Sequence, residues 1–174
     1  MSNPEAEDLS DATEASRLLA GAARTIKRAR YCWLVTAAED GFANLRPMGR
    51  LLPDADEGKD EWMIRFITDG RSRKASDIRR ADKVAIIFQH DADDAFAALI
   101  GKAERFESES EVGERWRDTY DALVPTAEDR ANAMFVEVEI QRMELWIRGV
   151  TAEPFGFRTT ILERDARGNW QVVG

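Results

Sequence analysis

Cysteine and histidine are almost absent from this chain of 174 residues, which contains one of each, Cys32 and His90. A single cysteine cannot close a disulfide within the chain, and it cannot build a cysteine-rich zinc site. A Ser-His-Asp triad would have to use His90, and a metal site with two histidines cannot form. The sequence therefore disfavours triad hydrolases and histidine-rich metal centres.

A surplus of positive charge is also missing, as are long apolar runs. Lysine and arginine total 25, aspartate and glutamate total 33, and the net charge is −8. A general nucleic-acid binder needs surplus cations to neutralise phosphates, so the charge balance argues against that class. No apolar run approaches the roughly 18–20 residues of a membrane span, and the acidic N-terminus is unlike a signal peptide. We expect a cytoplasmic protein with no nucleic-acid or membrane partner, although a local basic patch for an anionic small molecule stays open.

The length and the hydrophobic fraction of 44% are those of one ordinary domain, which buries its core without disulfides. Residues 1–11 are rich in Glu, Asp, Ser and Asn, and they are predicted to form a flexible N-terminal arm. Residues 12–174 contain no internal repeat and are predicted to form a single domain.

The apolar pattern predicts mainly strands, with a few helices at the periphery. A helix is expected over residues 11–30, a second over 72–81 with Ser72 as its N-cap, and a third over 108–124. Strands are expected over residues 31–36, 42–52, 61–68, 83–90, 95–106 and 133–148. Gly41 lies in a hairpin turn, and residues 53–60 form a polar loop. Six strands at this spacing favour an antiparallel β-barrel over a parallel α/β sheet.

The most informative segment is residues 67–74, where a strand ends, Gly70 allows a reversal and a helix begins after Ser72. The free N–H groups and the dipole of a helix N-terminus attract anions. Three cations surround this terminus, although the dipole disfavours positive charge there: Arg71, Arg73 and Lys74. A bound phosphate would relieve that clustering. The alternative from the residues alone is a capped surface helix with solvated cations.

Two other features matter less when each is taken alone. Arg46 lies within an otherwise apolar strand, where an arginine either extends its head to water or pairs with an anion. Trp146 ends the last predicted strand, a position typical of a core or an interface.

Taken in order, these motifs resemble the pyridoxamine 5′-phosphate oxidase-like family of FMN-binding split barrels, particularly its general stress protein branch. The order is an Asp-Gly hairpin, an Arg-Pro strand, T-x-x-x-S-R-K, a Gly-Lys-Ala strand, a helix and a closing E-x-W. The similarity runs from about Ala29 to Trp146. Its most specific element is T-x-x-x-S-R-K, present as Thr68, Ser72, Arg73 and Lys74.

The resemblance implies a six-stranded antiparallel split β-barrel that forms a homodimer, with FMN bound in clefts at the interface. It also implies that Arg46 and Lys74 hold the FMN phosphate, with Ser72 and Arg73 beside them. Because the flavin carries the electrons, such a protein needs no catalytic histidine, cysteine or metal.

The resemblance further implies residues along the flavin ring. Pro47, Met48 and Gly49 would follow the isoalloxazine edge with backbone donors and acceptors. Ile67 and Thr68 would line the ring or the ribityl chain.

Near the C-terminus the resemblance is partial. Trp146 and Arg158 match a Trp and an Arg that approach the flavin from the other subunit. The Arg-x-His element with which the oxidases grip their substrate appears here as Pro154–Gly156, and a glutamine placed against the flavin falls at about Phe96. Genuine pyridoxamine-phosphate oxidase activity is therefore not expected.

The function implied is that of an FMN-dependent oxidoreductase acting on an unidentified small substrate. A non-catalytic flavin-binding stress or sensor protein is the alternative, because the sequence identifies no proton-transfer residue. A split barrel that uses deazaflavin or haem is a third candidate, and His90 is the only histidine available as a haem ligand.

Overall fold

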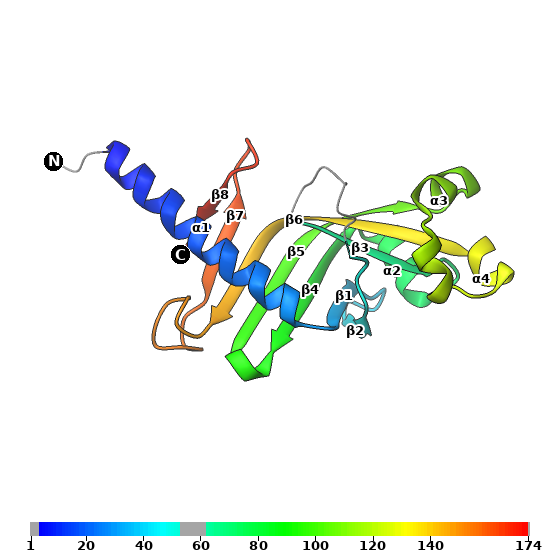
Figure 1. Ribbon diagram of the computed structural model, residues 1–174, viewed down its shortest axis with the longest axis horizontal. Coiled ribbons are helices and arrows are strands. Elements are labelled where there is room, and N and C mark those ends of the chain that lie inside the picture. Colours follow the sequence, from blue (N-terminus) through cyan, green and yellow to red (C-terminus); the bar gives the residue numbers. More distant parts are fainter. Residues whose placement is uncertain (1–3, 53–61, 174) are drawn as a thin grey trace. The chain divides into compact units, whose positions relative to one another are not determined.

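The computed structural model describes residues 4–52 and 62–173. Residues 1–3 of the predicted arm and the predicted polar loop at 53–60 lie outside these ranges. Within them the chain is mainly β, with four α-helices and two short 3₁₀-helices around eight strands (Figure 1).

The strands are β1 Cys32–Ala37, β2 Ala43–Met48, β3 Met63–Asp69, β4 Lys83–His90, β5 Ala95–Phe106, β6 Ala133–Ile147, β7 Thr160–Arg164 and β8 Trp170–Val172. The helices are α1 Pro4–Arg28, α2 Arg73–Arg80, α3 Glu109–Arg115 and α4 Ala127–Ala131, with 3₁₀-helices η1 Asp91–Asp93 and η2 Asp118–Ala122.

Hydrogen-bonded neighbours follow the order β2-β1-β4-β5-β6-β7-β8, and β3 pairs with β6. Strand β6 is 15 residues long and is hydrogen-bonded to three strands, β5, β3 and β7. Its first half runs antiparallel to β3, with Met63 opposite Glu139, and its second half runs antiparallel to β7, with Arg142 opposite Glu163. The predicted antiparallel, mainly β class is confirmed.

The chain packs as two compact units, each built from separate stretches. Unit 1 comprises the chain up to Trp33, Ala85–Ile100 and the residues from Gln141 onward. Unit 2 comprises Leu34–Val84 and Gly101–Ile140.

In unit 1, helix α1 packs against β8. Its inward face carries Ala15, Leu18, Ala22 and Ile26, all buried, at the spacing of an amphipathic helix. A Cβ added at Gly21 would lie 2.9 Å from Val150 Cγ1, so α1 closely approaches the chain after β6. No helix in the described ranges is long and apolar enough to cross a membrane.

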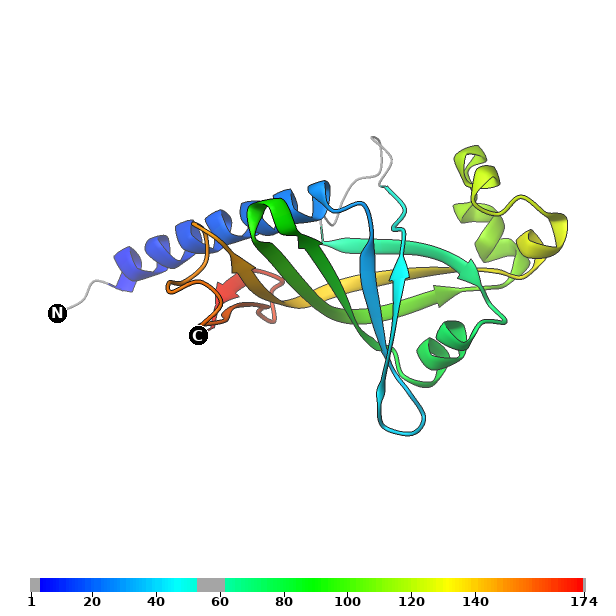
Figure 2. The same ribbon diagram turned by 90° about the horizontal axis from the view of Figure 1, so that it is seen from below.

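In unit 2, β1 and β2 form a hairpin around Gly41, whose φ of +86° confirms the predicted turn (Figure 2). Strands β3 and β6 bury Ile64, Phe66, Val136 and Val138 on one face, as their alternating pattern requires. Helices α3 and α4 and the η2 turn are grouped at one end of this unit.

Several elements differ from the prediction. The count of six strands is wrong for the described chain, because β7 and β8 add a hairpin whose turn contains Gly168 at φ +85°. Helix α1 begins at Pro4, within the predicted arm, where proline suits a first helical turn because its missing N–H is not needed there.

The predicted helix over 108–124 is interrupted as well. Ser108 caps α3 through a capping box with Glu111, but α3 ends at Arg115. Trp116 then adopts an extended conformation, and its Nε1 donates to Asp121 Oδ1 at 2.9 Å. The Trp116 ring also contacts the Phe135 ring edge to face, and this tertiary packing outweighs helix continuation.

Candidate cofactor site

The predicted phosphate site lies within unit 2, where β3 leads into α2. Gly70 donates its N–H to Asn132 O at 2.7 Å, which fixes the end of β3. Ser72 caps α2 as predicted: its backbone is extended, and its Oγ accepts from Ala75 N at 3.3 Å.

Arg46 points inward from β2 instead of extending into water. Its side chain is 17% exposed, its Nη1 donates to Thr36 Oγ1 at 2.8 Å, and its Nη2 lies 3.4 Å from Asp77 Oδ2. Asp77 lies on the buried face of α2, so Arg46 connects the β1–β2 hairpin to this helix. The guanidinium is therefore held beside α2.

Asp77 is the centre of a hydrogen-bond network. Its Oδ2 accepts from Thr36 Oγ1 at 2.8 Å and from Asn44 Nδ2 at 2.9 Å, and its Oδ1 lies 3.3 Å from Arg80 Nη2. Burial alone would raise the pKa of Asp77, but the hydrogen bonds from Asn44, Thr36 and Arg80 together hold that pKa below its ordinary value. The carboxylate is thus ionised at neutral pH.

Lys74 lies in the first turn of α2 and is half-buried. Burial lowers the pKa of Lys74, and the positive charge of Arg46 lowers that pKa further, against a smaller opposing effect of Asp69. The structure therefore brings Arg46 and Lys74 close enough to repel each other. Two cations beside a helix N-terminus are unfavourable alone and become favourable around a bound anion.

The neighbouring arginines differ in whether carboxylates already neutralise them. Arg73 is exposed and makes no ion pair with any residue in the described ranges. Arg71 instead lies 2.9 Å from both Asp69 Oδ2 and Glu128 Oε1, and its hydrogen bonds hold the pKa of Asp69 below its ordinary value. Arg71 therefore ties the β3–α2 turn to α4 and is not left for a ligand.

The residues expected along the ring lie at the ends of β2 and β3. Pro47 and Gly49 are exposed, whereas Met48, Ile67 and Thr68 are half-buried. Just beyond β2, Leu51 N donates to Arg65 O at 2.8 Å, which places the end of β2 beside β3. These five residues thus belong to adjoining segments of unit 2.

The remaining expected ligands belong to unit 1. Trp146 is half-buried on β6, and Arg158 is exposed before β7. Their contribution to the cofactor stays a prediction, as do the consequences of Phe96 and of Pro154–Gly156.

Sequence reasoning missed Asp77 and its partners Thr36 and Asn44. A signal was present, since Asp77 lies between Ala75 and Ile78 on the apolar face of a short helix. A carboxylate there has to be paired when it is buried.

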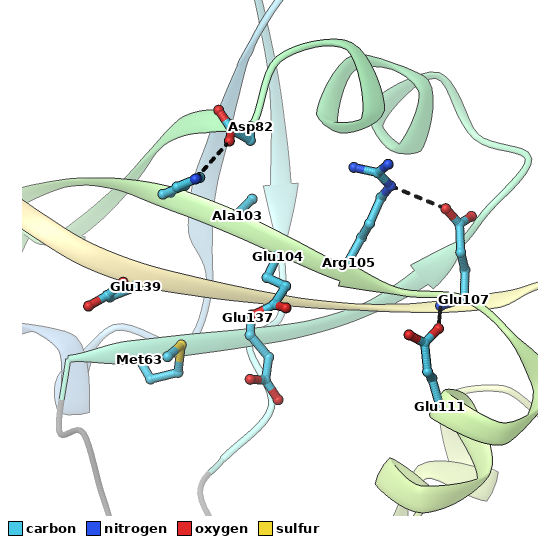
Figure 3. A pocket seen from close by; sticks show the side chains of 10 residues that line it. Met63, Asp82, Ala103, Glu104, Arg105, Glu107, Glu111, Glu137 and Glu139 are labelled. Atoms are coloured by element: carbon cyan, nitrogen blue, oxygen red, sulfur yellow. Dashed lines mark hydrogen bonds and ion pairs between the residues drawn. The ribbon is translucent and has the colours of Figure 1, made fainter.

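A hollow of about 670 Å³ lies elsewhere in unit 2, against β3, β5 and β6 (Figure 3). Six of its lining residues are acidic: Asp82, Glu104, Glu107, Glu111, Glu137 and Glu139. Its two cations are already paired, Lys102 with Asp82 at 3.5 Å and Arg105 with Glu107 at 3.3 Å. This acidic lining does not suit a phosphate, and it includes none of the expected FMN ligands.

Within the described ranges, no group of three or more His, Cys, Asp or Glu side chains is arranged to hold a metal ion. His90 Nδ1 lies 3.1 Å from Asp93 Oδ2 in unit 1.

Comparison with solved structures identifies the fold. A Clostridium acetobutylicum protein related to general stress protein 26 of B. subtilis matches at a TM-score of 0.64 and 15% identity, over 83% of this chain and 93% of that one. A pyridoxamine 5′-phosphate oxidase-related, FMN-binding protein from Nostoc punctiforme matches at 0.63 and 14%, over 100% and 99%. An F420 reductase matches at 0.52 and 20%, over 67% and 90%. The fold is the split-barrel type expected from the sequence.

Comparison with curated proteins finds no match. The family model described as "Pyridoxamine 5′-phosphate oxidase like" matches residues 20–167, which is well over half of the sequence and includes every expected cofactor ligand. The chain therefore belongs to the pyridoxamine 5′-phosphate oxidase-like family.

Proposed function

We propose that this protein binds FMN and acts as a flavin-dependent oxidoreductase on a small substrate. The observation that carries the proposal is the placement of Arg46 and Lys74 together beside the capped start of α2. FMN supplies the electron transfer when it is bound, and the protein holds and orients it.

The charge of this site and the fixed position of Arg46 support its binding the phosphate of FMN. Arg46 presents a planar guanidinium whose position is set by Thr36 and Asp77, and Lys74 adds a point charge from the helix. Burial and then the charge of Arg46 lower the pKa of Lys74, and a dianion between the two cations would offset their repulsion. Arg73, which has no ion pair among the described residues, supplies a further cation nearby in sequence.

The test is a titration with FMN and, in parallel, with riboflavin, which lacks the phosphate. Lys74→Ala is expected to weaken FMN binding by about ten- to a hundredfold, the range for a hydrogen bond to a charged group, and to leave riboflavin binding unchanged. Lys83→Ala is the matched control, because Lys83 is exposed at the start of β4 in the same unit. Equal FMN affinity in the wild type and Lys74→Ala would refute the phosphate site.

We further propose a homodimer with FMN at the interface. Three large apolar side chains along residues 42–52 face water: Phe42 is 76% exposed, Leu45 57% and Leu52 69%. Leu45 lies on β2 and the other two lie on either side of it, and within the described ranges β2 is the last strand of the order β2-β1-β4. Exposed apolar side chains on an edge strand are typical of an interface. A monomer in light scattering at micromolar concentration would overturn this part of the proposal.

Turnover is tested separately from binding. The FMN-loaded protein is mixed anaerobically with NADH or NADPH, and the bleached flavin is then offered a panel of acceptors. Bleaching and recovery support an oxidoreductase, whereas the absence of either half-reaction across the panel identifies a non-catalytic flavin binder. Pyridoxine phosphate is not the proposed substrate, because Pro154–Gly156 replaces the substrate-gripping Arg-x-His element.

A deazaflavin is the second candidate cofactor, and it is favoured by the structural similarity to an F420 reductase. The same titration with F420 separates the two, since the preferred cofactor will bind more tightly and survive gel filtration. A Soret band in the purified protein would indicate haem instead.

A further inference from the structure

A second group of cations surrounds a hollow of about 300 Å³ in unit 1. The hollow lies between the C-terminal half of α1, the start of β5 and the end of β6. Its walls include three arginines, Arg24, Arg28 and Arg148, with apolar surface from Ile147 and Val150. Its volume is at the lower end of the range for small-molecule pockets.

In the part of the chain that the structure describes, carboxylates pair with two of these arginines and not with the third. Arg28 pairs with Asp93, and Arg148 Nε lies 2.6 Å from Asp94 Oδ2. Arg24 makes no ion pair or hydrogen bond with any residue in the described ranges. The hollow thus holds a surplus of positive charge in a chain whose net charge is −8.

The walls of the hollow are fixed by contacts on both sides. Arg17 Nη1 donates to Val150 O at 2.7 Å, and Gly21 permits the close approach of α1 to Val150. On the other side, the guanidinium of Arg148 lies 4.3 Å from the centre of the Phe155 ring in addition to its bond to Asp94. Such prior fixing lowers the entropic cost of binding a ligand.

We propose that this hollow binds a small organic oxyanion, a carboxylate or a phosphate with a short apolar body. Arg24 supplies the uncompensated cation, and Arg28 and Arg148 keep N–H groups beyond those that bond to Asp93 and Asp94. Guanidinium groups bind carboxylate and phosphate through paired N–H donors. Ile147 and Val150 contact the apolar body.

The proposal is tested by isothermal titration calorimetry with butyrate and, separately, with inorganic phosphate. Heat with butyrate but not phosphate identifies a carboxylate with an apolar tail, and the reverse identifies a phosphate ligand. The proposal is overturned if neither gives heat up to about 10 mM, where millimolar affinity would already be visible.

Two variants of α1 and one of α2 locate the site. Arg24→Gln is expected to weaken binding at least about tenfold, the loss of one charge-assisted contact. Lys27→Gln removes the same charge from an exposed position on the same helix outside the hollow, and it is expected to bind as the wild type does. Equal weakening by both variants, or loss of binding in Lys74→Ala with retention in Arg24→Gln, would overturn the assignment. Circular dichroism confirms that each variant is folded.

Discussion

Asp77→Asn removes one charge and changes almost nothing in volume. The carboxylate is 4% exposed and accepts from Thr36, Asn44 and Arg80, with Arg46 at 3.4 Å. In the variant, an amide NH₂ replaces one acceptor oxygen and faces at least one donor of this network.

Hydrogen bonds to a charged group contribute about 1.5–3 kcal/mol each, and a buried group left unpaired costs about 1–3 kcal/mol. The amide keeps one acceptor oxygen, so we expect the free energy of unfolding to fall by about 1–3 kcal/mol, a large part of an ordinary domain's stability of about 5–15 kcal/mol. FMN affinity should fall as well, because Arg46 loses the carboxylate that positions it.

Urea unfolding measures the stability change, with Asp82→Asn as the control. Asp82 is 45% exposed and pairs with Lys102 at 3.5 Å, so its substitution should cost less than about 1 kcal/mol. Because folding lowers the pKa of Asp77, its contribution is present at neutral pH and is lost as the pH falls through that lowered pKa, below 3.8. If Asp77→Asn and Asp82→Asn unfold at the same urea concentration, the network does not stabilise the fold as argued.

Two further predictions address the site and the sheet. Because the pKa of Lys74 is lowered from 10.5, FMN affinity should decline with rising pH before pH 10.5 is reached. In a fluorescence titration, Lys74→Ala should remove that decline. Riboflavin affinity should show no such decline, because riboflavin lacks the phosphate. Gly101→Ala should destabilise by about 1–3 kcal/mol in urea, because the new Cβ overlaps the Glu139 carbonyl oxygen and is 2.9 Å from Val138 Cγ1. Gly113→Ala in α3 places its new Cβ in open space and should raise the free energy of unfolding by up to about 1 kcal/mol. If Gly101→Ala were the more stable of the two variants in urea, the close approach of β5 and β6 would be contradicted.

The elements that sequence reasoning placed well are those whose pattern is local. The bounds of β4 and β5 match the predicted 83–90 and 95–106, because alternating apolar residues and turn signals delimit both strands. Strand β8 was missed because it has only three residues, too few to show an alternating pattern. The interruption of the third predicted helix was missed because it depends on Trp116 packing against Phe135, which is distant in sequence.

The same distinction holds for the candidate site. Ser72 was predictable as a cap because its partner Ala75 lies three residues away. The role of Asp77 was not, since Thr36 and Asn44 lie 41 and 33 residues away and meet it only when the β1–β2 hairpin packs against α2.

Sequence gives the number of cations near α2, but folding decides which of them remain available to an anion. Arg71 and Arg79 are each held by carboxylates, Arg71 by Asp69 and Glu128, and Arg79 by Glu107. Arg46 shares a single carboxylate, Asp77, with Arg80.

Lys74 forms no ion pair within the described ranges, and its pKa is lowered first by burial and then by the positive charge of Arg46. Within the described ranges the positive charge at the start of α2 thus exceeds the carboxylates that pair with it, and an anionic ligand would restore the balance. In unit 1, Arg28 and Arg148 each pair with a carboxylate, whereas Arg24 has no such partner within the described ranges. Both sites are therefore defined by cations that folding brings together and leaves uncompensated, within a chain that is acidic as a whole.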